Sequence, residues 1–331
     1  MTIMRPTVGA SLLTTMLALA TAACGGGDGG LNSTPPPAPA PSTTPAPTPT
    51  PAAAVPPLPD GPIGLQSDRP FATFSVHTDG WGTISTDADA VEIAYSAADG
   101  TYTLTLPEYE EGVLLPSGGN GSFDELGWIN LQSTGSDLAI GAGPETQLAY
   151  VTLAWPKSSP YTYTSYGDWS GQLPMGQNRG VFAYGTPTVE GDVPRIGSAS
   201  YSGEVWGLTN GEPTLSGGEV GPVLDVYGTV SLSFDFAAGT LAGEMLPTIY
   251  PEWDPVSLGR YTFRDTVYSS GSMTFAGAFE VPDSDSPSSF LGRFTGPQAA
   301  ELMANWRAPF RDPESGGWGT MSGVWIAKKD N

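Results

Sequence analysis

The sequence predicts an all-β protein. From Gln66 onward, runs of about four to eight residues alternate apolar and polar side chains and are separated by Gly, Pro, Asn and Asp. This pattern is typical of short strands joined by turns. Hydrophobic residues make up 39% and aromatic residues 10% of the chain, which is enough for a packed core. Because only one short segment has helical spacing, we expect an antiparallel sandwich or barrel.

The chain begins with a segment typical of a secretory signal peptide, residues 1–23. Arg5 supplies one positive charge, and the apolar stretch from 8 to 20 is too short for a membrane span. Two alanines then precede Cys24, an arrangement that resembles the lipobox of bacterial lipoproteins. This resemblance implies that acyl chains on Cys24 anchor the protein in the lipid of the outer membrane. The alternative is an ordinary signal peptide followed by an incidental cysteine.

Residues 24–62 are expected to form a Gly- and Pro-rich stalk. Glycines follow Cys24, and 13 prolines lie among Ala, Ser and Thr between Pro35 and Pro62. Proline fixes φ and removes the amide donor, so this segment disfavours helix and sheet and extends as polyproline II. At about 3.1 Å per residue, the stalk would hold a domain well away from a membrane surface.

The charge and the rare residues exclude several classes of protein. Asp and Glu number 34 against 12 Lys and Arg, which gives a net charge of −22, and the chain has one His and one Cys. A nucleic-acid binder needs a basic face, a disulfide scaffold needs paired cysteines, and a His-rich metal site needs several histidines. The sequence contains neither the G-x-S-x-G motif of serine hydrolases nor a P-loop. We therefore do not expect an enzyme.

The C-terminal part, after a boundary near residues 187–194, divides into eight candidate strands. They are Ser198–Trp206, Leu224–Phe236, Thr240–Leu246, Gly259–Tyr268, Ser272–Glu280, Ser289–Thr295, Trp306–Phe310 and Gly319–Lys328. Eight antiparallel strands can close into a small barrel, which removes exposed edges. Such a barrel is either filled by its own side chains or holds one small ligand.

Two segments of this part show contrasting periods. Residues 229–236 alternate, and they place four apolar side chains on one face: Val230, Leu232, Phe234 and Phe236. Residues 298–307 instead carry apolar side chains at helical spacing: Ala299, Leu302, Met303 and Trp306. We therefore expect one short accessory helix over 298–307.

Four ordered motifs resemble the β-barrel domain of transferrin-binding protein B. They lie at Gly197–Gly203, Phe234–Gly243, Phe290–Glu301 and Gly317–Trp325. The resemblance implies an N-terminal β handle, residues 63–187, followed by an eight-stranded antiparallel β-barrel, residues 188–331. It also implies a lipidated protein displayed on the outer membrane, and relatives bind iron-carrying host proteins, haem or complement regulators. The chain has room for one such lobe, whereas transferrin-binding protein B has two.

His77 and a group of tyrosines are the candidate ligand-binding residues. Some relatives capture haem through a histidine, so the resemblance makes His77 a candidate axial ligand; the alternative is a surface histidine on an alternating strand. Tyr161, Tyr163 and Tyr166 lie close in sequence to Trp155 and Trp169. These aromatics predict either a protein-docking or sugar-stacking patch, or a core that joins the two subdomains.

Two acidic groups are candidates for a catalytic or a metal site. Glu108, Glu110 and Glu111 could supply a carboxylate for glycoside hydrolysis or for Ca²⁺, or form a solvated turn, and the turn is favoured. Asp283 and Asp285 begin like a calcium loop, but the glycine of that loop is missing. We expect no metal ligands, and the cofactor that the resemblance allows is haem.

The sequence thus predicts an outer-membrane surface lipoprotein that binds a solute or a partner protein in nutrient capture, of iron or haem. One alternative is a protein-interaction lipoprotein without a small ligand, and another is a lipid-anchored carbohydrate-active enzyme. The acidic surface either steers a basic partner or keeps an exposed, tethered protein soluble. A hollow barrel would favour solute binding, and a filled barrel would favour contact with a protein.

Overall fold

The structure is a computed structural model, and it describes most of the chain from residue 71 onward. The described residues are 71–78, 84–88, 91–96, 101–105, 113–116, 128–131, 147–154, 160–173, 176–210, 223–251 and 254–331. The predicted signal peptide, residues 1–23, and the predicted stalk, residues 24–62 with Cys24, lie outside them. Within these described segments, no helix is long and apolar enough to cross a membrane.

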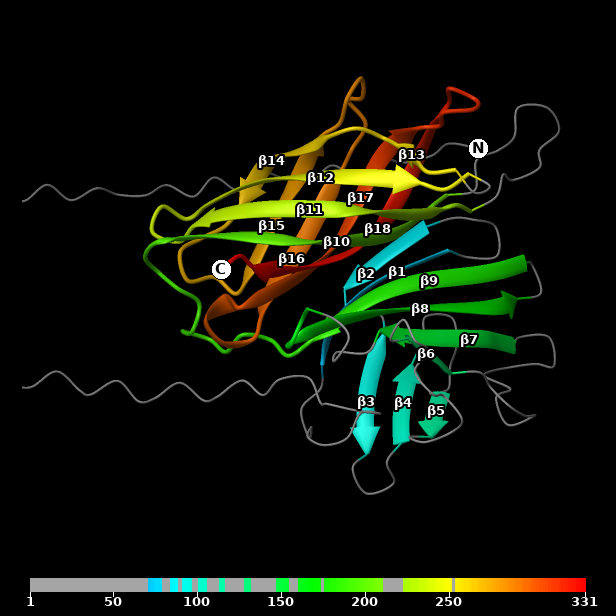
Figure 1. Cartoon of the computed structure of the whole chain (residues 1–331), viewed down its shortest axis with the longest axis horizontal. Helices are drawn as coiled ribbons and strands as arrows, with labels where there is room; N and C mark the ends of the chain where they lie inside the picture. Colours follow the sequence, from blue (N-terminus) through cyan, green and yellow to red (C-terminus); the bar gives the residue numbers. More distant parts are fainter. Residues whose placement is uncertain are drawn as a thin grey trace, which may run out of the picture. The chain divides into compact units, whose positions relative to one another are not determined.

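Within the described part of the chain, eight strands close into an antiparallel barrel (Figure 1). They are β10 (Ser198–Thr209), β11 (Asp225–Asp235), β12 (Thr240–Ile249), β14 (Tyr261–Val267), β15 (Thr274–Glu280), β16 (Ser289–Thr295), β17 (Glu301–Arg311) and β18 (Trp318–Lys329). Their order is β11-β10-β18-β17-β16-β15-β14-β12, and pairing of β11 with β12 completes the ring. The short β13 (Val256–Ser257) pairs with β12. The predicted barrel is confirmed, because each of the eight predicted strands overlaps one of these.

The chain before the barrel forms two further sheets in its described segments. One has the order β2-β1-β9-β8-β7-β6, and we call it the handle sheet. Its strands are β1 (Ala72–Thr78), β2 (Ile84–Ala88), β6 (Trp128–Leu131), β7 (Gln147–Ala154), β8 (Thr164–Leu173) and β9 (Gly176–Gly185). The other consists of β3 (Glu92–Ser96), β4 (Thr101–Thr105) and β5 (Val113–Pro116). The predicted all-β class is therefore confirmed both for the barrel and for the described segments that precede it.

One face of the handle sheet packs on the outside of the barrel wall. Phe74 and Val76 of β1 and Val181 of β9 share a buried cluster with Met303 of β17 and Val324 of β18. These side chains are at most 8% exposed. Apolar area removed from water stabilises by about 25 cal/mol per Å², so this cluster joins the handle sheet firmly to the barrel.

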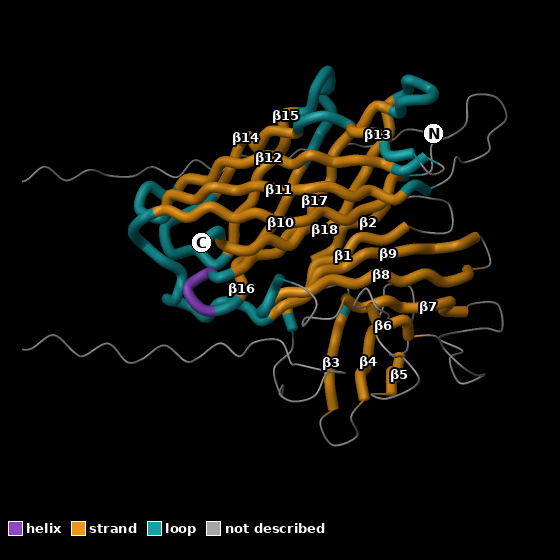
Figure 2. The backbone as a smooth tube through the Cα atoms, in the orientation of Figure 1, coloured by secondary structure: helices purple, strands orange, loops and turns teal. Residues whose placement is uncertain are grey.

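The prediction of a helix over residues 298–307 is wrong. A single 3-10 turn, η1, covers Pro297–Ala299, and the chain then continues as strand β17 (Figure 2). Leu302 points into the barrel, whereas the next residue, Met303, packs against the handle sheet. Because both faces of β17 are covered, apolar residues occur on both, and their run imitates helical spacing.

Candidate functional site

The barrel interior is filled by aromatic side chains. The Phe234 ring has its centroid 4.9–5.6 Å from four others, those of Tyr201, Tyr268, Phe275 and Phe294. Glycines opposite the rings make room for them, because a Cβ at Gly292 would overlap the Phe275 ring. Interiors of small barrels either pack in this way or hold a ligand, and this barrel packs. Any binding site must therefore lie outside it.

A cleft of about 90 Å³ lies between the handle sheet and the barrel. We call it the junction cleft. The side chains of Tyr166, Asp168 and Arg179, from β8 and β9, form one wall, and those of Trp206, Asp225 and Tyr227, from β10 and β11, form the other. A pocket for a drug-sized molecule measures about 300–1,000 Å³, so the junction cleft suits a group of only a few atoms.

Strand alternation explains which side chains face the junction cleft. On β8, Tyr166 and Asp168 are two residues apart and therefore share a face, and Asp168 lies opposite Val181 of β9, which packs on the barrel. On the barrel, the interior side chains of β11 are Val226 and its alternate neighbours. Asp225 and Tyr227 therefore point outward, toward the handle sheet.

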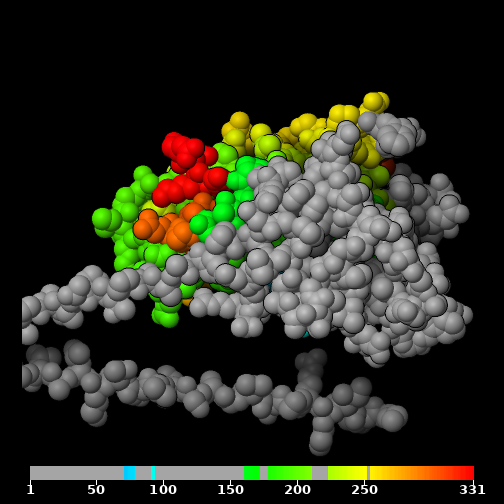
Figure 3. Space-filling model, turned by 60° about the horizontal axis from the view of Figure 1, so that its bottom comes forward, coloured from blue at the N-terminus to red at the C-terminus, as the bar shows by residue number. Residues whose placement is uncertain are grey.

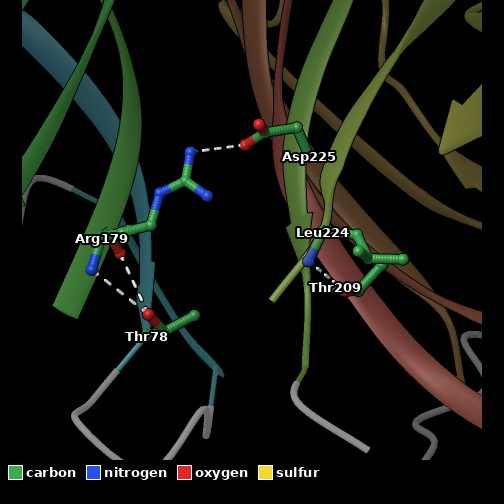
Figure 4. Close-up of polar contacts among 5 residues, drawn as sticks. All are labelled: Thr78, Arg179, Thr209, Leu224 and Asp225. Carbon is green, nitrogen blue, oxygen red and sulfur yellow. Dashed lines mark hydrogen bonds and ion pairs between the residues drawn. The ribbon is translucent and has the colours of Figure 1, made fainter. Parts of the chain in front are cut away.

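Two contacts tie the walls of the junction cleft together. The rings of Tyr166 and Trp206 stack with centroids 3.5 Å apart and planes at 22°. The Nη2 atom of Arg179 donates to Oδ1 of Asp225 across 2.6 Å, as Figure 4 shows. The hydroxyl of Thr78 bonds to the backbone of Arg179 and holds that end of β9 to β1. The two walls of the cleft are therefore joined by one ring stack and one ion pair.

Two carboxylates and one guanidinium line the junction cleft, and they affect its tyrosines. Burial raises the pKa of Tyr227 to about 12, and the nearby charges of Asp225 and Asp168 add to the rise, while Arg179 opposes it. Burial also raises the pKa of Tyr166, with smaller contributions from Glu204 and Asp168. Burial disfavours the ionised form of a tyrosine, and nearby carboxylates disfavour it further, so both hydroxyl groups stay protonated at neutral pH.

The three predicted tyrosines occupy different environments. Tyr166 lines the junction cleft, as described above. Tyr161 is buried, and its hydroxyl donates to the carbonyl of Ile326 over 3.4 Å. The ring of Tyr163 fills the space that a Cβ at Gly296 would occupy. The structure thus makes Tyr161 and Tyr163 part of the joint between the two subdomains and leaves Tyr166 as the one at a cleft.

Glu301 is the centre of a second junction, which we call the Glu301 clamp. It is 1% exposed, and it accepts hydrogen bonds from the backbone N–H groups of Thr162 at 2.6 Å and Tyr163 at 2.9 Å. Lys328 donates to the carbonyl of Pro160 nearby, at 2.9 Å. In Figure 3, residues at the C-terminal end of the chain, in red, lie next to residues in orange and in green. Desolvation raises the pKa of Glu301 above its ordinary value.

His77 is buried, so the expectation of a surface histidine is wrong. Its residue is 5% exposed, and its ring centroid lies 6.3 Å from that of Trp169. It pairs across β1 and β9 with Gly180, over which the Trp169 indole lies. The two rings therefore share the face of the handle sheet that is turned away from the barrel. Haem ligation by His77 stays a prediction.

The acidic candidates do not form a site in the described residues. Glu108, Glu110 and Glu111 lie outside the described part of the chain. Asp283 lies in a tight turn closed by a bridge between Val281 and Ser284. Among the residues that the structure describes, no three His, Cys, Asp or Glu side chains are grouped so as to hold a metal ion.

Sequence reasoning missed five residues of the junction cleft, namely Asp168, Arg179, Trp206, Asp225 and Tyr227. None of them belongs to a catalytic or binding motif, and Arg179 is separated from Asp225 by 46 residues. One of them could have been found from the sequence, because Tyr227 is an aromatic residue on the outward face of an alternating strand. The pairing of the two walls depends on how the handle sheet packs on the barrel, which local patterns do not encode.

The fold is similar to crystal structures of transferrin-binding protein B and of a surface lipoprotein. A double mutant of transferrin-binding protein B from Haemophilus parasuis is 16% identical, with 78% of this chain and 45% of that chain covered and a TM-score of 0.41. The protein from serogroup B Neisseria meningitidis is 15% identical, with 78% and 44% covered and a TM-score of 0.40. The surface lipoprotein is 14% identical, with 78% and 98% covered and a TM-score of 0.35.

The chain spans less than half the length of the two transferrin-binding proteins. Neither a family model nor a curated protein matches it. The likeness to the solved structures concerns the fold alone.

Proposed function

We propose that this chain is a surface lipoprotein whose folded lobe binds a partner protein. The observation that supports this proposal best is the filled barrel. Side chains such as Phe234, Phe294 and Trp325 occupy its interior at no more than 1% exposure. Binding then has to use the outer surface, and a shallow outer surface with small clefts suits a protein better than a free small molecule.

The exposed apolar and aromatic side chains of the barrel are consistent with protein contact. Tyr227 is 42% exposed and Tyr250 is 38% exposed, and their rings meet edge to face at 5.3 Å. Tyrosine is enriched at the energetic centres of protein interfaces. The tyrosine pair lies next to the junction cleft, since Tyr227 also lines that cleft.

The proposed position of the lobe follows from the N-terminal sequence. Acyl chains on Cys24 would hold the protein in the outer membrane, and the Pro-rich segment 35–62 would extend the lobe into the medium. The net charge of −22 would repel an anionic membrane and attract a basic partner. An iron-carrying host protein is the partner class that the resemblance to transferrin-binding protein B suggests.

The structure offers less support for an enzyme. Glycoside hydrolysis needs two carboxyl groups that act on one substrate from opposite sides. Asp168 and Asp225 both line the junction cleft, but Asp225 is bound to Arg179. The cleft is also too small for a sugar ring with its neighbours.

Capture by the full chain tests the proposed function. The full lipidated chain in detergent, mixed with host serum or with the growth medium of its own cells, should retain one dominant protein after washing. A variant in which Cys24 is replaced by Ser should lose labelling by a palmitate analogue and should still capture that protein. Recovery of a small molecule without any protein would contradict the proposal.

A further inference from the structure

The junction cleft combines three properties that select one kind of ligand: small volume, aromatic walls and an excess of carboxylates. We infer that it is a subsite for one cationic side chain, a lysine or an arginine, that projects from the partner protein. This inference rests on the proposed function and names the group of the partner that the lobe would recognise. Binding of this side chain requires no change in the fold.

The size of the cleft fits a cationic head group. A buried water needs on the order of 10–15 Å³ of cavity, and the junction cleft has about 90 Å³. It therefore has room for several heavy atoms, as in an ammonium or guanidinium group with part of its stem. A haem or a sugar chain would need several times this volume.

The aromatic walls favour a cation with an apolar stem. Three aromatic rings line the cleft: Tyr166 and Trp206, which stack on each other, and Tyr227, which is 42% exposed. Cations are attracted to the faces of such rings by about 0.5–2 kcal/mol. The methylene stems of lysine and arginine also pack on apolar surface while the charged group stays hydrated or paired.

The charge of the cleft excludes anions. Asp168 and Asp225 line it from opposite walls, and Glu204 lies close enough to affect the ionisation of Tyr166. Among the described lining residues, Asp168 and Asp225 are two carboxylates and Arg179 is one cation, which is bound to Asp225. Like-charged groups repel an anionic ligand, and complementary ones attract a basic partner and position it.

A side chain fits the cleft better than a metal ion. Hard metal ions bind through several oxygen ligands and make little use of aromatic walls. In the described part of the chain no group of three acidic, His or Cys side chains is placed to hold a metal. Aromatic rings beside carboxylates are instead the surroundings in which interfaces bury an arginine or a lysine.

Blocked amino acids test the subsite directly. The full chain, with its tryptophan indoles labelled with ¹⁵N, is titrated with N-acetyl-arginine amide, N-acetyl-lysine amide and the neutral N-acetyl-citrulline amide. The Trp206 signal is assigned from the Trp206→Phe variant. The expected result is a saturable shift of the Trp206 signal with the two cations and none with citrulline. An equal shift with citrulline, or no saturable shift with any probe, overturns the inference.

Matched variants decide whether the charge of the cleft matters. Asp168→Asn should weaken binding of the arginine probe on the order of fivefold, through the loss of one facing charge. Glu280→Gln removes the same charge from an exposed residue at the end of β15 and should leave the affinity within twofold. If both variants weaken binding of the arginine probe equally, the attraction depends only on the net charge of the protein, and the subsite is contradicted. If Asp168→Asn does not fold, Tyr227→Leu at the edge of the cleft replaces it.

The captured partner separates this inference from the proposed function. A partner that binds the wild type and Asp168→Asn equally well would support protein binding and refute the cleft as its subsite. Binding of the arginine probe at Trp206 without capture of any partner would support the subsite chemistry and refute the proposed function.

Discussion

Strands β11 and β17 belong to the same barrel, yet their sequences differ in pattern. Along β11, buried and exposed residues alternate from Thr229 to Asp235. Along β17, every residue from Glu301 to Trp306 is buried. The inner faces of both strands meet the same aromatic core. The difference arises outside, because the handle sheet covers β17 and water covers most of β11.

This contrast shows that a strand reveals its period only where one of its faces meets water. On β17, Leu302 and Met303 are neighbours in sequence, both are fully buried, and they belong to two different clusters. Selection for apolar residues then acts on every position, and the period of two disappears.

The inner faces of the two strands are expected to respond alike and most strongly. Phe234→Ala on β11 and Trp306→Ala on β17 each remove a buried ring from the barrel core. Loss of such a ring costs about 3–5 kcal/mol of unfolding free energy. Urea unfolding followed by circular dichroism measures it. A loss below 1 kcal/mol at either position would break the analogy between the two inner faces.

The outer faces are expected to respond differently. Met303→Ala on β17 empties a site under the handle sheet and should cost about 2–5 kcal/mol. Ser233→Ala on β11 changes a residue exposed to water and should stay within about 0.5 kcal/mol. The same unfolding experiment compares them. Equal losses would mean that the handle sheet does not protect the wall at β17.

The Glu301 clamp should contribute a smaller amount. Glu301→Gln turns an acceptor of two backbone hydrogen bonds into a group that presents an N–H₂ donor to one of them. An unpaired buried polar group costs about 1–3 kcal/mol, so the variant should unfold earlier in urea. The matched control is Glu280→Gln, which alters an exposed carboxylate on β15.

The difference in stability between the wild type and Glu301→Gln should depend on pH with a definite sign. Desolvation raises the pKa of Glu301 in the folded state, so the folded protein keeps the proton to a higher pH than the unfolded chain does. The stability of the wild type therefore falls, relative to the variant, as the pH rises from the ordinary carboxyl pKa to the raised one. The difference in unfolding free energy between the wild type and Glu301→Gln should narrow over that pH window and then stay constant. A gap that widens with pH would show that the folded site prefers the carboxylate.

The ion pair between Arg179 and Asp225 should have the smallest effect. The two side chains are 27% and 37% exposed, so water and salt screen their attraction. A double-mutant cycle with Arg179→Met and Asp225→Asn should give a coupling of about 0.2–1 kcal/mol at low salt and less at high salt. A coupling that does not change with salt would indicate a pair more deeply buried than the structure shows.

The candidate site was predicted only in part. Tyr166 stood out because several aromatics lie close together in its segment, and the structure places it at the junction cleft. Trp206 and Asp225 did not stand out, because an aromatic or an acid on an isolated strand has no distinguishing neighbours. A polar residue in an alternating strand is expected to face water, whereas His77 is buried beside Trp169.

The sequence by itself determined the strand class, the eight barrel strands and the inward face of β11, because alternation and turn residues are local properties of the chain. Tertiary structure alone decided that the strand predicted over 306–310 begins at Glu301, that the barrel is filled and that a cleft joins Tyr166 to Tyr227. The physical reason is the same in each case. Burial from a second layer depends on segments far apart in sequence, and it removes the contrast with water on which sequence patterns depend.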